Sequence, residues 1–142
     1  MKFLLWKNDH LKIEQCYTCA LPGYLIVSPN SATDALYKLE TSALNELGGV
    51  LARATQAVQI IIKPQKIYCA QFGEEESAIH FHIFPRSLVL TTEFLKENPN
   101  QKTLIHGPVL LDWARAKYKA KPEEVWSIVQ ASMSQLRNAL RT

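Results

Sequence analysis

Five short segments of the chain are rich in apolar residues, and those at about 11–16 and 78–84 also show the two-residue period that places every second side chain on one face of a β-strand. Turn-forming residues such as Asn8–Asp9 and Pro22–Gly23 separate some of these segments. The pattern predicts strands at about 2–7, 11–16, 24–28, 66–72 and 78–84. We therefore expect an antiparallel sheet of about five strands.

Other segments repeat apolar residues every three or four positions, which is the spacing of a helix face. Thr41 or Ser42 can cap a long helix that stops before Lys63–Pro64 and contains the pair Gly48–Gly49. Glycine in a helix costs about 1 kcal/mol relative to alanine, so we expect close packing or a bend at this pair. Further helices are expected at about 33–38, 91–97 and 109–119 and from 122 onward. The expected fold class is α+β, with helices packed on one face of the sheet and a site on the other face or at its edge.

The last predicted strand carries His80 and His82, which lie two residues apart and therefore share one face. A neutral imidazole has a lone pair that can attack an electrophile such as phosphorus. His80 is the candidate catalytic nucleophile, with its other ring nitrogen donating to a fixed acceptor such as a backbone carbonyl. His82 is the candidate donor to a substrate oxygen. The alternatives are two rings that only border a sheet, or a metal site, for which no acidic or thiol partner stands at a convincing spacing.

The residues around these two histidines resemble the histidine-triad (HIT) family of nucleotide hydrolases and transferases. In that family three histidines alternate with apolar residues, and Pro-Arg often follows. Aligning the motif on Pro85–Arg86 matches His80 with the middle, nucleophilic histidine and His82 with the last one. Ala78 then stands at the position of the first histidine, so the resemblance implies an incomplete triad.

The resemblance extends well upstream of the motif. Leu21–Pro29 is similar to the family's Pro-Gly turn and the strand after it, and Lys63–Gly73 is similar to its helix end and next strand. In total the likeness covers roughly residues 1–86, which implies a HIT-like core. We expect residues 87–142 to form a helical C-terminal extension that covers the substrate mouth or packs on a partner subunit, all within one domain spanning 1–142.

The chain departs from the family pattern at two further places. Ala32 stands three residues after Pro29, where many relatives have a histidine, and Glu74–Glu76 replace a small-residue phosphate loop. Three adjacent carboxylates repel a polyphosphate unless they face away or hold a divalent cation. These departures leave open whether a site of this kind still catalyses the turnover of a substrate.

Gln71 matches a position where the family often has Gln or Asn in contact with the phosphate or the leaving group. A four-residue hairpin loop at 74–77 would place Gln71 opposite His80, with both side chains on the same face. A five-residue loop would put it on the wrong side. We adopt the four-residue loop, so Gln71 and His82 are the predicted substrate-binding residues.

Composition agrees with a single compact domain. The 142 residues carry a formal net charge of +3, spread without the dense basic stripe that nucleic acid requires. No apolar stretch approaches the ~20 residues of a membrane span, and the opening apolar run is too short for a signal peptide. We expect a cytoplasmic protein that binds neither nucleic acid nor membrane.

The three cysteines, an odd count at low density, argue against a disulfide scaffold. Cys69 lies in an apolar strand and is expected in the core. Cys16 and Cys19 form a C-x-x-C pair, and some HIT proteins bind zinc through such a pair completed by histidines. Here the partner positions are plausibly Ala32 or Ala78, so we expect no metal cofactor beyond a divalent cation bound with the substrate.

The resemblance implies a nucleotide hydrolase or transferase acting at the α-phosphorus of a dinucleoside polyphosphate, such as diadenosine tetraphosphate, or of a nucleoside phosphoramidate. His80 would form a nucleotidyl-histidine intermediate. The partners would be a small nucleotide and, as the family implies, a second copy in a homodimer. The alternatives are a catalytically weak or inactive nucleotide-binding dimer and a metal-dependent phosphoesterase using Glu74–Glu76 with His80.

Overall fold

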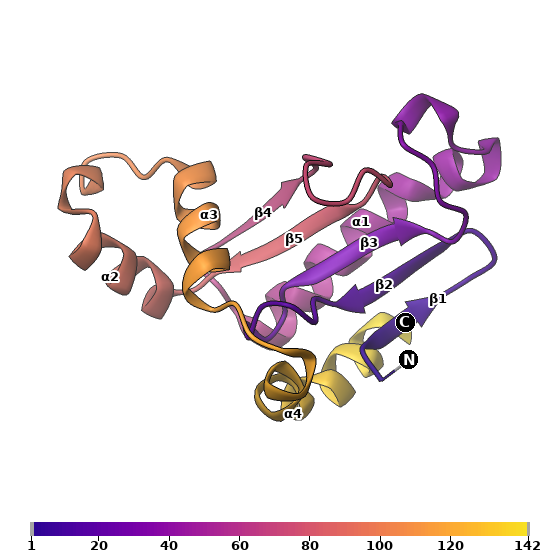
Figure 1. Ribbon diagram of the computed structural model, residues 1–142. Helices are drawn as coiled ribbons and strands as arrows, with labels where there is room; N and C mark the ends of the chain where they lie inside the picture. The colour runs from indigo at the N-terminus through magenta and orange to yellow at the C-terminus, as the bar shows by residue number, and fades with distance from the viewer. Residues whose placement is uncertain (1, 142) are drawn as a thin grey trace.

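The computed structural model describes residues 2–141, which form five strands, four α-helices and two short 3₁₀ helices (Figure 1). The strands are β1 (Leu4–Lys7), β2 (Leu11–Gln15), β3 (Leu25–Pro29), β4 (Lys66–Ala70) and β5 (Phe81–Arg86). The helices are α1 (Thr41–Ile62), α2 (Leu88–Glu97), α3 (Gly107–Lys117) and α4 (Pro122–Arg141), with 3₁₀ helices η1 (Leu36–Lys38) and η2 (Pro99–Gln101). The predicted α+β class is confirmed.

All five strands belong to one antiparallel sheet with the order β1-β2-β3-β5-β4. β5, which carries most of the histidine motif, therefore has hydrogen-bonding neighbours on both sides. His82 lies beside Ile26 on β3 and beside Ala70 on β4. A one-residue slip of β5 would turn every side chain to the opposite face, so pairing on both sides fixes which face His82 occupies.

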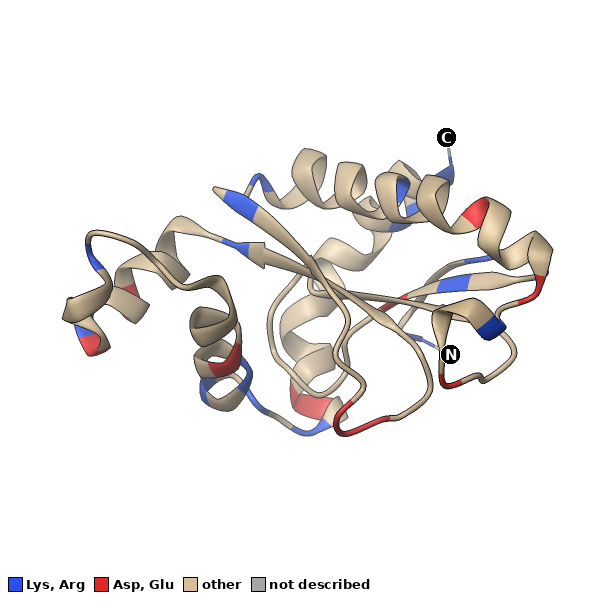
Figure 2. Ribbon diagram, turned by 90° about the horizontal axis from the view of Figure 1, so that it is seen from above, with Lys and Arg blue, Asp and Glu red and all other residues tan. Residues whose placement is uncertain are grey.

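Different helices cover the two faces of the sheet. Leu25 and Ile83 belong to the larger hydrophobic cluster, which contains the buried faces of α1 and α4. Tyr24 and Phe84 project to the other face and belong to a second cluster with residues of α2 and α3. The α2 segment extends beyond the end of the sheet in both views (Figures 1 and 2). The face expected to carry the site is therefore partly covered by the C-terminal helices, at one end.

The hairpin between β4 and β5 differs most from its prediction. β4 ends at Ala70 rather than at 72, and β5 begins at Phe81 rather than at 78. The reason lies in the backbone of the loop, where the Ile79 amide donates to the Thr33 carbonyl at 2.7 Å instead of to a neighbouring strand. His80 therefore lies just before the strand and not within it.

The long helix α1 spans the predicted range, but its predicted N-cap was wrong. Glu40, rather than Thr41 or Ser42, occupies the N-cap, and its side chain makes no capping hydrogen bond. Close packing does not explain the glycine pair, because Gly48 and Gly49 are exposed and a Cβ on either would meet no atom within 4 Å.

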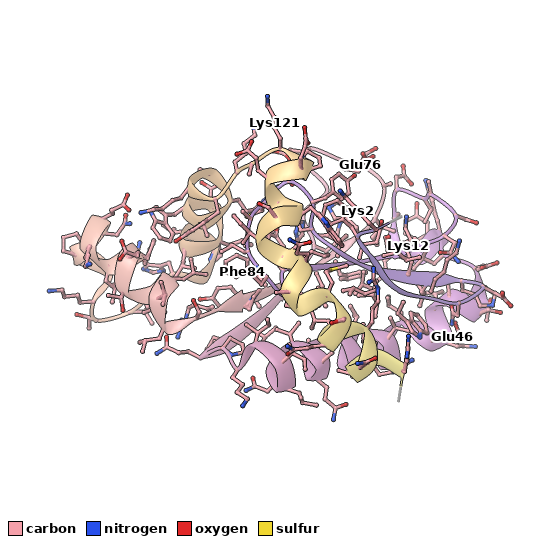
Figure 3. All side chains as sticks on the ribbon, turned by 90° about the horizontal axis from the view of Figure 1, so that it is seen from below. Lys2, Lys12, Glu46, Glu76, Phe84 and Lys121 are labelled. Carbon is pink, nitrogen blue, oxygen red and sulfur yellow. The ribbon has the colours of Figure 1, made fainter. Side chains whose placement is uncertain are left out.

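Helix α4 packs on α1 and along the outer edge of the sheet at β1 (Figure 3). The Arg137 guanidinium donates to the carbonyl of Lys2 at 2.7 Å and to that of Leu4 at 2.9 Å and 3.1 Å. Main-chain acceptors of this edge, which have no strand partner, are satisfied in this way. Within residues 2–141, no helix is long and apolar enough to cross a membrane.

The turn before β3 is organised by the side chain of Gln15, which is fully buried. Its Nε2 donates to the carbonyls of Cys16, Leu21 and Tyr24 at 3.3, 2.9 and 3.1 Å, and its Oε1 accepts from the Gly23 amide at 3.0 Å. One amide group thus supplies partners for four main-chain groups of the 16–24 segment. This network holds Tyr24 at the start of β3.

We expect Gly23→Ala to lower the free energy of unfolding by about 2 kcal/mol or more. Gly23 has a φ of 82°, and an added Cβ would lie 2.5 Å from Cγ1 of Ile62. Gly48→Ala is the matched control, because the site is helical, exposed and open; it should raise the free energy of unfolding by about 0.5–1 kcal/mol. Urea denaturation measures both, and shifts of the same sign would contradict this account of the turn.

Candidate active site

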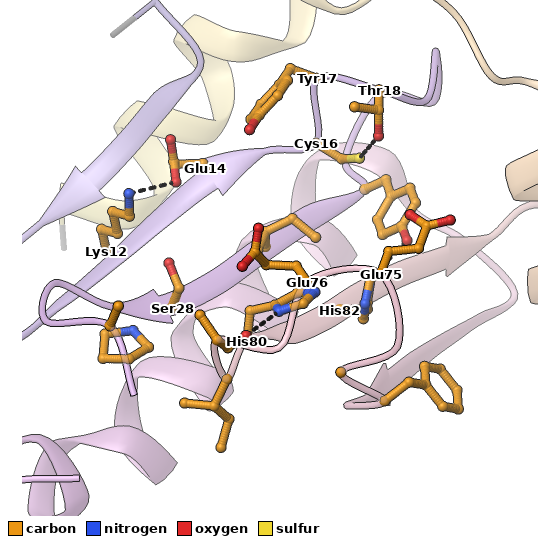
Figure 4. A pocket seen from close by; sticks show the side chains of 18 of the residues that line it. Lys12, Glu14, Cys16, Tyr17, Thr18, Ser28, Glu75, Glu76, His80 and His82 are labelled. Atoms are coloured by element: carbon orange, nitrogen blue, oxygen red, sulfur yellow. Dashed lines mark hydrogen bonds and ion pairs between the residues drawn. The ribbon is translucent and has the colours of Figure 1, made fainter. Parts of the chain in front are cut away.

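A cavity of about 550 Å³ lies on the face of the sheet that carries His82, at the end where β5 begins (Figure 4). Residues of β2, β3, the loop between β4 and β5, and α3 line it. This volume is typical of a small-molecule site. His80 and His82 both line the cavity, so the structure brings the two predicted histidines together.

His80 is oriented by a hydrogen bond to the main chain. Its Nδ1 lies 2.8 Å from the carbonyl oxygen of Ala78. A carbonyl can only accept, so Nδ1 carries the proton and Nε2 carries the lone pair. One ring nitrogen of His80 therefore has a backbone acceptor, as expected from the sequence.

His82 is only 5% exposed, and its ring centroid lies 4.9 Å from that of His80. Its Nδ1 lies 2.7 Å from the hydroxyl oxygen of Tyr24, which is 1% exposed. Burial, followed by the charges of His80 and Arg115, lowers the pKa of His82 from 6.5 to about 4. Burial also raises the pKa of the Tyr24 hydroxyl, so both groups are neutral near pH 7.

The same contact sets the tautomer of His82. Within residues 2–141, the acceptor that lies within hydrogen-bond distance of the Tyr24 hydroxyl is Nδ1 of His82. If Nδ1 carried the proton, the buried Tyr24 hydroxyl hydrogen would have no partner, which is costly. Tyr24 therefore donates to Nδ1, and the proton of His82 resides on Nε2. The ring presents a neutral N–H donor.

The predicted role of Gln71 depended on a hairpin register that the structure does not have. Ala70 pairs with His82, so the next residue along β4 falls at the level of Phe81, on the opposite face from His82. Gln71 is exposed and is not among the residues that line the cavity. The four-residue loop was wrong, and Phe72 lines the cavity instead, 6.2 Å from the His82 ring.

The two alanines at family histidine positions, Ala32 and Ala78, both line the cavity. So do Glu74–Glu76, which appear as one acidic segment of the loop in Figure 2. The loop carboxylates therefore do not all face away from the site. Among residues 2–141, no group of three or more histidine, cysteine, aspartate or glutamate side chains is arranged to hold a metal ion.

The remaining residues singled out from the sequence lie elsewhere. His10 pairs with Glu40 at 2.8 Å outside the cavity, and His106 does not line the cavity either. Arg86 donates to the Tyr68 hydroxyl at 3.1 Å. Their side chains therefore take no part in the cavity.

The cysteines differ in their surroundings. Cys16 and Cys19 are buried free thiols, and burial raises the pKa of Cys19 to about 12, which makes it a poor nucleophile. Cys16 Sγ lies 3.5 Å from the Thr18 hydroxyl. Cys69 is exposed, so the prediction of a core residue was wrong.

Two residues of the site escaped the sequence reasoning. Tyr24 follows the Pro22–Gly23 turn, and its place at the start of a strand was a signal that could have been used. Arg115 lies on α3, far from the histidine motif in sequence, and no sequence motif surrounds it.

The fold is that of the histidine-triad proteins. A HIT-like protein from Bartonella henselae involved in cell-cycle regulation, determined with an unknown ligand, is 18% identical with a TM-score of 0.62, and the match covers 96% of this chain and 84% of that one. A hypothetical histidine-triad nucleotide-binding protein from Sulfolobus tokodaii is 11% identical with a TM-score of 0.66, covering 98% and 83%.

A third structural neighbour has a stated activity. The diadenosine triphosphate hydrolase of Plasmodium falciparum, determined in complex with cyclomarin A, is 12% identical with a TM-score of 0.56, covering 71% of this chain and 78% of that one. No protein-family model and no curated protein matches the sequence. At these identities the comparisons establish the fold, and the chemistry must be argued from the site.

The lowered pKa of His82 predicts a pH-dependent stability. The unfolded histidine takes up a proton near 6.5 and the folded one only near 4, so the stability is full above 6.5 and falls as the pH decreases from 6.5 to 4. The expected loss from this group is about 3 kcal/mol. Urea denaturation across this range should show a shallower pH dependence for His82→Gln than for the wild type; identical pH profiles would contradict the assigned pKa.

Proposed function

We propose that this protein is a nucleotide hydrolase or transferase that uses His80 to attack the α-phosphorus of a nucleotide. The hydrogen bond of 2.8 Å between His80 Nδ1 and the Ala78 carbonyl is the observation that carries the proposal. It directs the lone pair to Nε2 of a ring that lines a cavity large enough for a nucleotide. The structural neighbours with the same fold include a diadenosine triphosphate hydrolase.

The reaction has two steps. Nε2 of His80 forms a bond to the α-phosphorus, while the bond from phosphorus to the leaving group breaks and the leaving group takes that electron pair. The resulting nucleotidyl-histidine carries a P–N bond. Water, or another acceptor in a transferase, then attacks the phosphorus, the P–N bond breaks, and His80 is restored as the nucleoside monophosphate departs.

His82 supports both steps as a neutral donor. With its pKa at about 4, the ring is not an imidazolium near pH 7 and cannot act there as a strong acid. Its Nε2–H donates instead to a phosphate oxygen, on which negative charge grows in each transition state. Tyr24 acts through His82 by holding the proton on Nε2, and is therefore a positioning residue.

The proposed substrate class rests on the resemblance to the histidine-triad family. A dinucleoside polyphosphate such as diadenosine tetraphosphate, or a nucleoside phosphoramidate, presents the α-phosphorus that this chemistry needs. The loop carboxylates at Glu74–Glu76 disfavour a bare polyphosphate, and a divalent cation bound with the substrate would offset that repulsion.

The second candidate function, a catalytically weak nucleotide-binding protein, is favoured by Ala32, by the loop carboxylates and above all by Ala78. An alanine cannot supply the donor or base that an imidazole would supply at this position. The hydrogen bond to His80 nevertheless comes from the carbonyl of residue 78, which any residue provides. We therefore favour the enzyme over the inactive binding protein.

A second copy of this chain is the proposed protein partner. Arg137 covers the outer edge of β1, whereas β4, the strand at the other edge, has no strand beyond it within residues 2–141. An uncovered edge strand offers unpaired main-chain groups to another chain. Pairing along Lys66–Ala70 would give the homodimer that the family resemblance implies.

His80→Ala should reduce turnover of diadenosine tetraphosphate and of an adenosine phosphoramidate by about 10³-fold or more, because the attacking nitrogen is lost. His10→Ala is the matched control, since it removes an imidazole outside the cavity. Mass spectrometry of the wild type, quenched in alkaline denaturant in which the P–N bond survives, should detect the adenylyl adduct on the peptide that contains His80. Equal rates for the wild type and His80→Ala would end the proposal.

Turnover, measured beside binding, separates the two candidate functions. Calorimetry with adenosine monophosphate (AMP) should show binding in both cases. Tight binding without turnover across both substrate classes would favour the inactive binding protein over the enzyme.

Tyr24→Phe should lower kcat by about tenfold with little change in KM, because His82 loses the partner that fixes its tautomer. The ¹⁵N chemical shifts of the His82 ring should change from a single tautomer, protonated at Nε2, to a mixture. A merely structural role for Tyr24 would lower stability and leave the tautomer unchanged, so an unchanged ring spectrum contradicts the positioning role.

A further inference from the structure

The cavity carries more negative than positive charge. Four carboxylates line it, one from β2 and three from the loop at 74–76. In the described part of the chain, two cationic side chains face them, Lys12 and Arg115. A site for a nucleotide needs a cation that can neutralise a phosphate, so the partners of these two side chains decide which one is available.

Lys12 is held by a neighbour on its own strand. Its Nζ lies 3.1 Å from Oε1 of Glu14, and these side chains are 36% and 25% exposed. Residues two apart on a strand share a face, so the pair stays together as long as β2 does. Lys12 is therefore largely neutralised by a fixed carboxylate.

Arg115 is paired differently. Its Nη2 lies 3.3 Å from Oε2 of Glu75, a side chain that is 86% exposed and belongs to a loop. Ion pairs with so exposed a partner contribute little to stability, so the contact is easily exchanged for a better one. Figure 4 shows Glu75 on the loop at the side of the cavity that holds His82.

The backbone of Arg115 is fixed although its ion pair is weak. The preceding residues Leu111 and Ala114 are buried in the cluster that also contains Tyr24 and Phe84. The guanidinium is close enough to the histidines for its charge to contribute to the lowered pKa of His82. Helix α3 thus holds a cation at the cavity on a rigid support.

We infer that Arg115 binds a phosphate group of the nucleotide, and that the Glu75 carboxylate occupies the guanidinium until the phosphate displaces it. This inference rests on the proposed function. A guanidinium presents parallel N–H donors that match two phosphate oxygens as well as two carboxylate oxygens. The phosphate carries more charge than the carboxylate, and it would be bound by several groups of the cavity at once, so the exchange favours the substrate.

This exchange makes affinity depend on the phosphate and not on the nucleoside. A ligand that lacks a phosphate would not displace Glu75 from the Arg115 guanidinium. The effect also assigns a role to α3, which lies outside residues 1–86, where the sequence resembles the family. The Glu75 carboxylate of the loop then competes with the phosphate for the Arg115 guanidinium.

Calorimetry with AMP and with adenosine tests the inference. The wild type should bind AMP more tightly than adenosine by about tenfold or more, and Arg115→Ala should lose that difference by weakening AMP alone. Arg115→Lys, which keeps the charge but not the paired donors, should be intermediate. Lys117→Ala is the matched control, because it removes a cation of the same helix that does not line the cavity.

The Glu75→Gln variant tests the competition directly. Removing the competing charge should raise AMP affinity by about fivefold when Arg115 is present. In the Arg115→Ala background the same change should raise it by less than about twofold. An equal gain in both backgrounds would mean that Glu75 only repels the phosphate, which overturns the exchange.

The outcomes separate the inference from the proposed function. AMP binding that is unchanged by Arg115→Ala overturns the role of Arg115 and leaves the proposal for His80 intact. A wild type that binds neither ligand overturns both. Circular dichroism and thermal unfolding of each variant show that a lost affinity does not come from lost folding.

Discussion

The hydrogen bond between the Tyr24 hydroxyl and His82 Nδ1 is the contact on which the rest of the site depends. It joins β3 to β5 beneath the cavity, and it exists because the buried Gln15 amide holds the turn that delivers Tyr24. Gly23 is required in that turn, since its positive φ and its closeness to Ile62 exclude a side chain. The tautomer of His82 is thus determined by the main-chain geometry of the turn between β2 and β3.

The two histidines are supported by different means, and this explains how an alanine can stand at position 78. His80 is oriented by a carbonyl of the main chain, which does not depend on the identity of the residue that supplies it. His82 is oriented by a side chain, so its tautomer would be lost if Tyr24 were replaced. A substitution in the motif can therefore be less damaging to the geometry than one in a distant turn.

The sequence was informative where short-range alternation decides the structure. It predicted the five strands, the shared face of His80 and His82, and the need for a backbone acceptor. It failed at Gln71, because the loop length of a hairpin depends on where the Ile79 amide finds its partner, and that partner lies some forty-six residues upstream at Thr33. Arg115 could not be predicted either, since only the packing of α3 brings it to the cavity.

Helix α3 is part of the site and not an addition to it. Leu110, Leu111 and Ala114 of α3 cover the same cluster that buries Tyr24 and Phe84. Without α3, water would reach the Tyr24 hydroxyl and the desolvation that lowers the pKa of His82 would weaken. The same helix carries Arg115, whose partner Glu75 has an exposed carboxylate. The burial of the histidine pair and the position of the Arg115 cation therefore both depend on the packing of α3. A change that destabilises this helix would also affect the chemistry at β5.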